Sequence, residues 1–152
     1  MITPNDIMNA LEALVKEKFP GEDVHQDLCP QGFTRPCTLI VQDECTCNVG
    51  FGTAIIEFSP VFTLTTFVPT DEYHQSHLAE LHQRQMILTG LFLPGYIKVK
   101  DRAPKVSSLK LAGGYDYDTV TVALSYTLLR SEFEEAVSAP LMEHFNFDTR
   151  GE

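Results

Sequence analysis

Four cysteines and one histidine are the first residues of this chain that could bind a metal ion. They are His25, Cys29, Cys37, Cys45 and Cys47. A tetrahedral zinc site would combine Cys45 and Cys47 with Cys29, Cys37 or His25. Structural zinc sites usually take two ligands from a knuckle in which two to four residues separate them. Here one residue separates Cys45 from Cys47, and no second knuckle follows. We therefore expect plain thiols, with no metal and no disulfide.

Three histidines form a second group that could do acid–base or metal chemistry. They are His74, His77 and His82, and the acidic residues beside them are Asp71, Glu72 and Glu80. Their spacing is not the His-Glu-x-x-His pattern of zinc proteases. Histidines at the polar start of an amphipathic helix usually face solvent, so we expect a solvated helix face here.

Other catalytic signatures fail on spacing. Gly50-Phe51-Gly52 is not followed by the third glycine of a dinucleotide loop, and no glycine-rich loop ends in Lys-Ser or Lys-Thr. A Gly-x-Ser-x-Gly elbow is also missing. Asp116 and Asp118 follow the glycine pair at residues 113–114, where they are typical of a turn. The sequence therefore predicts no catalysis and no cofactor.

Composition narrows the class of protein further. The chain has 152 residues, of which 43% are hydrophobic and 21% charged, enough for one folded domain. Its net charge of −10 repels phosphate backbones, which argues against a general nucleic-acid binder. We expect no secretory leader, since the first residues carry no basic segment before an apolar one. We also expect no membrane span, since the longest apolar-rich run, residues 53–68, is interrupted by Glu57 and Pro60.

The elements that must position these residues begin with a helix. Thr3 is suited to be its N-cap, Pro4 its first residue and Asp6 a partner of the helix dipole. Pro20-Gly21 ends it. Its apolar stripe consists of Ile7, Leu11, Leu14, Val15 and Phe19.

A second helix is predicted from Thr70, as its cap, to the Pro94-Gly95 pair. Glu80 and Arg84 are spaced to form an ion pair on its outer side. The other side is predicted to contain Leu78, Leu81, Gln85 and Leu88, widened by Ile87, Leu91 and Phe92.

Strand patterns fill the remainder up to residue 129. They cover residues 23–28, 37–41, 51–67, 96–100, 106–111 and 119–129. Pro60 indicates that the third of them bends or lies at an edge of the sheet. The last alternates strictly between two faces and is predicted to lie in the sheet interior. Its apolar face consists of Val120, Val122, Leu124, Tyr126 and Leu128.

The order helix, strands, helix, strands predicts an α+β fold. We expect an antiparallel, possibly mixed sheet with the two main helices packed on one face. Residues 1–130 form the predicted single domain. Residues 131–152 form a C-terminal segment beyond this domain, which is acidic at first, breaks at Pro140, and is aromatic at Phe145 and Phe147.

Several segments of the chain resemble the corresponding segments of the tail terminator proteins of long-tailed phages and prophages. Those proteins are small α+β chains that begin with a helix like the one predicted here. Over the first quarter of the chain the matching segments are Met1-Ile2-Thr3, Asp6-Ile7, Phe19-Pro20 and, above all, Gln31-Gly32-Phe33 with Pro36-Cys37. Beyond it the match is architectural, with a mid-chain helix, the segment Tyr96-Ile97-Lys98-Val99 and a long alternating strand. Cys45, Cys47 and the C-terminal segment after Leu129 lie outside the family's pattern.

The resemblance implies structural work. Such proteins form a ring, typically a hexamer, on the last ring of the tail tube, where they stop its polymerisation and present the surface that docks to the head. It implies partners in a tail tube protein and a head–tail connector protein, with DNA passing through the lumen without specific binding. It also implies no catalysis, metal or cofactor, and a location in the host bacterial cytoplasm during assembly and then in the virion tail.

Two alternatives stay open at the level of sequence. One is a head–tail joining protein of similar size, and the other is a small enzyme or ligand-binding α+β domain that uses the histidines. The local interpretation of Gln31-Gly32-Phe33 is a turn in which glycine relaxes the backbone and phenylalanine packs in the core. That interpretation is compatible with an assembly role.

Overall fold

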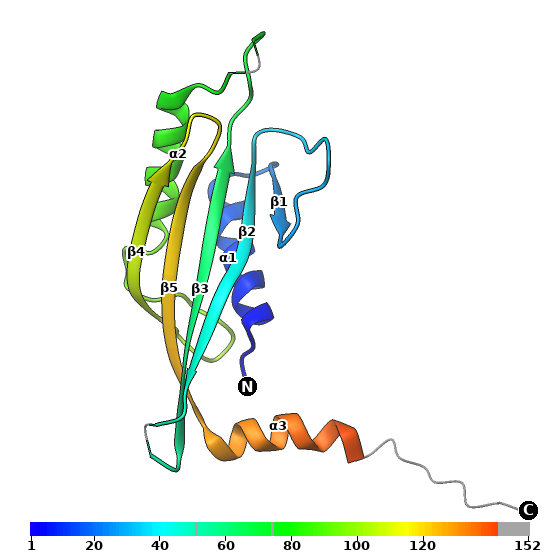
Figure 1. Cartoon of the computed structure of the whole chain (residues 1–152), viewed down its shortest axis with the longest axis vertical. Helices are drawn as coiled ribbons and strands as arrows, with labels where there is room; N and C mark the ends of the chain where they lie inside the picture. The colour runs from blue at the N-terminus through cyan, green and yellow to red at the C-terminus, as the bar shows by residue number, and fades with distance from the viewer. Residues whose placement is uncertain (51, 74, 143–152) are drawn as a thin grey trace, which may run out of the picture.

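The computed structural model describes residues 1–50, 52–73 and 75–142, with side chains up to residue 137 (Figure 1). Its elements in chain order are α1 (Pro4–Lys18), β1 (Asp23–Gln26), β2 (Cys37–Asn48), β3 (Ile55–Phe67), α2 (Leu78–Gly90), β4 (Lys105–Gly113), β5 (Asp118–Leu129) and α3 (Arg130–Met142). None of the described helices is both long and apolar enough to cross a membrane.

The five strands form one mixed sheet in the order β1-β2-β3-β5-β4. β1 runs parallel to β2, and the other neighbours are antiparallel. The predicted α+β class is therefore confirmed. So is the position of the last strand, since β5 lies between β3 and β4. The buried face of β5 consists of Val120, Val122, Leu124, Tyr126 and Leu128, as its alternation predicts.

Pro60 does not mark an edge, because β3 is the central strand. On the β2 side, Pro60 lies opposite Cys45 in an unbroken stretch of the ladder. On the β5 side, pairing is interrupted at Ser59 and Pro60, between the pairs at Phe58 and Val61. Of the two predicted alternatives, a bend or an edge position, the edge is therefore wrong: the ring nitrogen cannot donate, and the sheet accommodates it with a local gap in one ladder.

The start of α1 is confirmed in detail. The Thr3 hydroxyl accepts the Asp6 backbone N–H at 3.2 Å, and the Asp6 carboxylate accepts the Thr3 N–H at 2.8 Å. This reciprocal capping box satisfies backbone donors that the first turn leaves free. The backbone hydrogen bond from Thr3, assisted by Lys100, holds the pKa of Asp6 below its usual value.

The second helix begins seven residues later than predicted, since its N-cap is His77 and not Thr70. Thr70 does not cap it; α2 starts at Leu78, and residues 69–73 and 75–77 belong to a loop in which Thr70 bridges to Ser76. The Asp71 carboxylate accepts the backbone N–H groups of Tyr73 and Gln75, both at 2.9 Å. These local hydrogen bonds offer the backbone an alternative to the helical turn. The helix also ends earlier, at Gly90.

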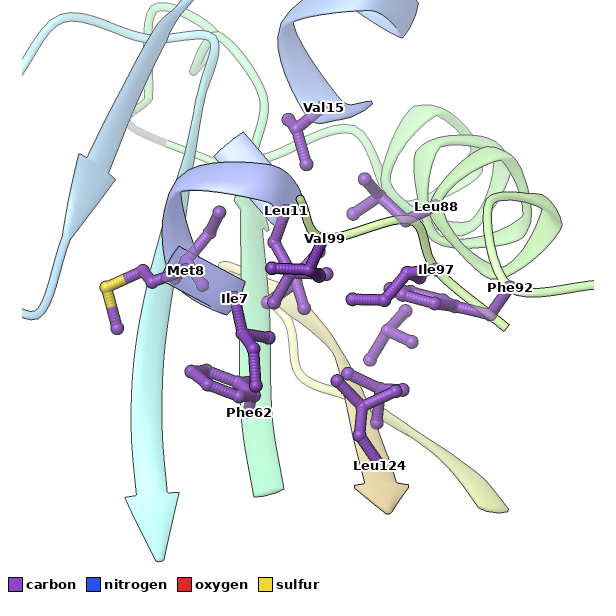
Figure 2. Packing of buried hydrophobic residues seen from close by; sticks show 14 of the residues in the cluster. Ile7, Met8, Leu11, Val15, Phe62, Leu88, Phe92, Ile97, Val99 and Leu124 are labelled. Atoms are coloured by element: carbon purple, nitrogen blue, oxygen red, sulfur yellow. The ribbon is translucent and has the colours of Figure 1, made fainter. Parts of the chain in front are cut away.

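Both α1 and α2 pack on one face of the sheet and enclose the core. Figure 2 shows side chains of both helices converging on Phe62 of β3 and Leu124 of β5, with Ile97 and Val99 closing the space between them. Residues 96–100, predicted as a strand, do not form one. This segment makes only two isolated β-bridges, from Tyr96 to Lys105 and from Val99 to Arg102.

At the opposite end from the α2 N-terminus, α3 follows β5 directly and extends away from the sheet (Figure 1). The predicted break at Pro140 is wrong, because α3 continues to Met142. A proline disturbs mainly the turn that precedes it, and here only two helical residues follow. Phe145 and Phe147 lie outside the described residues.

Candidate functional site

The motif residues Gln31, Gly32, Phe33, Pro36 and Cys37 occupy the connection from β1 to β2 and the first residue of β2. Gly32 has a φ of +73°, in the left-handed region, where any side chain would be strained. Gly32 therefore lies in a turn, as predicted, because its backbone adopts a conformation that favours glycine. Gln31 is exposed and Pro36 is half-buried, after a cis peptide bond, whereas Cys37 is fully buried.

Phe33 does not pack in the core between the helices and the sheet. Its ring lies 4.8 Å from that of Phe67, measured between centroids. Phe67 alternates along β3 with Thr66, whose hydroxyl accepts a hydrogen bond from Arg84 of α2. Successive strand residues face opposite sides, so Phe67 and Phe33 lie on the side of the sheet away from the helices.

Arg35, inside the motif, is the centre of this arrangement. Its guanidinium carbon lies 5.2 Å from the ring centroids of both Phe33 and Phe67. Its two terminal nitrogens donate to the two carboxylate oxygens of Asp116, at 3.2 and 3.3 Å, and one also donates to the Val68 carbonyl at 3.3 Å. This bidentate pair joins the motif to the turn between β4 and β5.

Asp116 belongs to a small network of hydrogen bonds. The Arg35 guanidinium holds the pKa of its carboxyl below the usual range, with a further contribution from Ser76, whose hydroxyl donates to Asp116 at 3.0 Å. An arginine does not release a proton near neutral pH, so Arg35 acts in this network as a fixed cation. Its effect is to hold three loops together at one end of the sheet; we call it the Arg35 clamp.

An open pocket of about 510 Å³ lies beside the Arg35 clamp. It is lined by Gln75, Ser76, Leu78, Tyr115 and Asp116. Two of its polar groups, the Ser76 hydroxyl and the Asp116 carboxylate, bind each other and Arg35. These two groups are therefore already engaged within the protein.

The predicted histidine group does not form as a unit in the described residues. His74 lies outside them, and His77 is the N-cap of α2 without a side-chain capping hydrogen bond. His82 is 60% exposed, as expected of a solvated face, but its Nδ1 lies 2.7 Å from the fully buried carboxylate of Asp118. Asp118 is thus more than a turn residue, since it joins α2 to the start of β5.

Arg84 has a different partner from the one predicted. Instead of pairing with Glu80, it donates to both carboxylate oxygens of Glu22, at 2.7 and 3.1 Å, and lies 4.0 Å from the centroid of the Phe19 ring. The side chain is largely buried between the helices, and there it reaches the segment that follows α1. This contact fixes α2 against α1.

The four cysteines are free thiols and fall into two separate groups. Cys45 and Cys47 are two apart on β2 and so share one face of it; burial, followed by the nearby Cys47, raises the pKa of Cys45. Cys37 instead lies with Cys29 and His25, and their potential ligand atoms are all within 4.8 Å of one another. The candidate zinc ligands considered from sequence, centred on Cys45 and Cys47, are therefore not the ones that lie close together.

The end of the molecule opposite the Arg35 clamp carries exposed apolar side chains. Beyond the helix layer, the β2–β3 hairpin and α3 form what we call the extension (Figure 1). Its exposed apolar residues are Val49, Ile55, Leu129 and Val137, with 58%, 42%, 54% and 52% of each exposed. Ile55 and Leu129 are directly opposite in the β3–β5 ladder.

Polar contacts fix α3 to the β2–β3 hairpin and to neighbouring parts of the chain. The Arg130 backbone N–H and its Nε donate to the carbonyls of Ala54 and Thr53, both at 2.8 Å. Glu132 pairs with Arg102 at 3.1 Å and with the N-terminal amine at 3.5 Å. The first turns of α3 are therefore held in a defined direction.

No family model and no curated protein matches the chain. Its function must be argued from its own residues.

Proposed function

We propose that this chain is a structural protein that caps the tail tube of a long-tailed phage or prophage, ends its polymerisation and provides the surface to which the head docks. The observation that carries the proposal is the resemblance at Gln31, Gly32, Phe33, Pro36 and Cys37, on a chain with an α+β order of elements. In this role it forms a ring of six copies on the tube protein and binds a head–tail connector protein. It assembles in the host bacterial cytoplasm and remains in the virion tail.

The environment of the motif favours architecture over catalysis. Gly32 is required by its backbone conformation, Phe33 packs on Phe67, and the intervening Arg35 is bound on both sides by rings and a carboxylate. Residues used in this way shape and stiffen a surface. We interpret the Arg35 clamp as the scaffold of one docking end.

The extension supports a role in assembly. Exposed apolar side chains gathered at one end of a chain are typical of surfaces that a partner covers. In a ring, each subunit would place its extension on a different surface of its neighbour, a head-to-tail contact that closes by rotation. Val49, Ile55, Leu129 and Val137 would then be covered by the neighbouring copy.

The net charge of −10 suits a protein whose ring surrounds DNA. Acidic walls repel the phosphate backbone, so the genome would pass without adhering.

The test is the length of tail tubes assembled from the cognate tube protein, measured by electron microscopy with and without this chain. We expect capped tubes of defined length in its presence and overgrown tubes in its absence. His77→Ala is the control and should cap normally, since the only role we assign to His77 is that of an N-cap residue without a side-chain capping bond. Tubes that grow at an unchanged rate in excess protein, with no density added at either end, would refute the proposal.

A further inference from the structure

The parallel pairing of β1 with β2 creates a cluster that the sequence spacing conceals. In this register Asp23 is opposite Cys37 and His25 is opposite Leu39, so His25 lies near the start of β2. The connection between the strands then returns Cys29 to the same place. One ring nitrogen of His25 and the sulfur atoms of Cys29 and Cys37 all lie within 4.8 Å of one another.

These separations are close to those of a metal site. Zinc binds thiolate sulfur at about 2.3 Å and imidazole nitrogen at about 2.0 Å in tetrahedral geometry, which places ligand atoms about 3.5–3.8 Å apart. Small rotations of the side chains would bring the three atoms to that spacing. A set of two sulfur ligands and one nitrogen ligand favours zinc over harder cations such as magnesium or calcium.

A second observation is independent of these distances. The Nε2 atom of His25 is buried and has no hydrogen-bond partner in the described part of the chain, and it is the one buried side-chain polar atom there of which this is true. A buried polar atom without a partner costs free energy. Either a ligand for this nitrogen, or a ligand for the other ring nitrogen that reorients the imidazole, would remove that cost.

The geometry points to a zinc site formed by His25, Cys29 and Cys37, with the fourth position taken by water or by a donor from a partner. On binding, each thiol loses its proton to solvent and the two thiolates and the imidazole donate electron pairs to Zn²⁺, with no change of oxidation state. The ion would tie the loop that carries Gln31–Pro36 to β1. This inference does not depend on the proposed role at the tail tube.

The Cys37 thiol lies in a buried setting with charged groups of both signs nearby. Burial, together with the nearby Cys29 and Asp23, raises the pKa of the Cys37 thiol to about 11, whereas Arg35 and Arg84 act in the opposite direction.

The experiment is a zinc titration of the reduced full chain against a chromophoric chelator, with Co²⁺ as a spectroscopic probe of thiolate ligation. We expect one ion per chain for the wild type, with sulfur-to-metal absorption for Co²⁺. Loss of even an outer-shell partner weakens metal binding about 10- to 100-fold, so Cys29→Ser and His25→Ala should each weaken it by at least about 100-fold. The matched control is Cys47→Ser, which alters an exposed thiol of the other group and should bind as the wild type does.

Thermal unfolding gives a second readout. Zinc should raise the Tm of the wild type and of Cys47→Ser but not of Cys29→Ser, since an ion that binds only the folded state stabilises it. Circular dichroism confirms that each variant is folded; Cys37→Ser is avoided because that side chain is fully buried. The inference is overturned by a wild type that binds neither ion, by equal binding in Cys29→Ser and His25→Ala, or by loss of binding in Cys47→Ser. A disulfide between Cys29 and Cys37 in protein isolated under reducing conditions would also overturn it.

Discussion

Arg35 shows what a single residue contributes and why sequence alone misses it. The guanidinium lies against two rings, and its carboxylate partner Asp116 is 81 positions away in the chain. No local pattern signals a contact of that separation. The motif residues around Arg35 were identifiable, but their shared partner depends on how β4 and β5 turn.

The depressed pKa of Asp116 predicts a specific dependence of stability on pH. A carboxyl whose folded-state pKa lies below its unfolded value stabilises the fold above that unfolded value, and the effect disappears as pH falls through the folded pKa. Asp116→Asn should therefore lower the free energy of unfolding at pH 7, by about 1 kcal/mol or less because the pair is partly exposed and screened. The difference from wild type should shrink below the usual carboxyl pKa of 3.8.

Urea denaturation at pH 7 and at decreasing acid pH measures this difference. The control is Asp101→Asn, which removes an exposed carboxylate that has no ion pair in the described part of the chain and should change little at either pH. An Asp116→Asn effect that is equal at neutral and acid pH would mean that charge is not its cause.

The cysteines give a second example at the scale of residues. Spacing along the chain directed attention to Cys45 and Cys47, because close neighbours are the usual source of zinc ligands. His25 and Cys37 are brought together by a parallel strand pair, and β1 is too short for its direction to be predicted from its four residues. The converging group could therefore be found only once the register was known.

At the scale of elements, the predictions that were confirmed depend on signals contained within one segment. The capping box of α1 spans four residues, and the alternation of β5 is complete over its whole length. The predicted start of α2 failed because Asp71 uses its side chain within the loop, a choice that propensity cannot distinguish from a helix start. The predicted edge position of the strand that contains Pro60 failed for a different reason, since a central strand can tolerate a gap in one of its two ladders.

The interior position of β5 predicts a large effect of a buried charge. Leu124→Asp would place a carboxylate among fully buried apolar side chains, with no partner to compensate its desolvation. We expect a loss of at least about 3 kcal/mol in the free energy of unfolding, measured by urea denaturation. Ser125→Asp is the control: it points to the other face, opposite Lys105, and should be close to neutral. Equal unfolding midpoints for the two variants would contradict the assigned faces of β5.

At the scale of the whole molecule, the two ends differ in character. One end is tied together by the Arg35 clamp, the Asp118–His82 pair and the pairing of Arg84 with Glu22. The other end is the extension, where a hairpin and a helix project beyond the helix layer with apolar side chains exposed; the clamp end also exposes large side chains, Tyr73 and Tyr115 among them. Under the proposed function, copies of the chain would join through the extension while the clamp end contacts a different partner.

Under the proposed function, this division predicts that the extension, and not the body, determines ring closure. Leu129→Asp and Val49→Asp replace exposed apolar side chains, so the free energy of unfolding should change by no more than about 0.5 kcal/mol. Both should nevertheless fail to cap tubes, because a charge would be buried without a partner at every contact of the ring. Leu93→Asp is the matched control: Leu93 is 77% exposed and lies outside the extension. Capping is measured at tube ends, where a template assembles the ring even if free subunits are monomers. Normal capping by both extension variants, with failure of Leu93→Asp, would move the subunit contact away from the extension and onto the surface near α2.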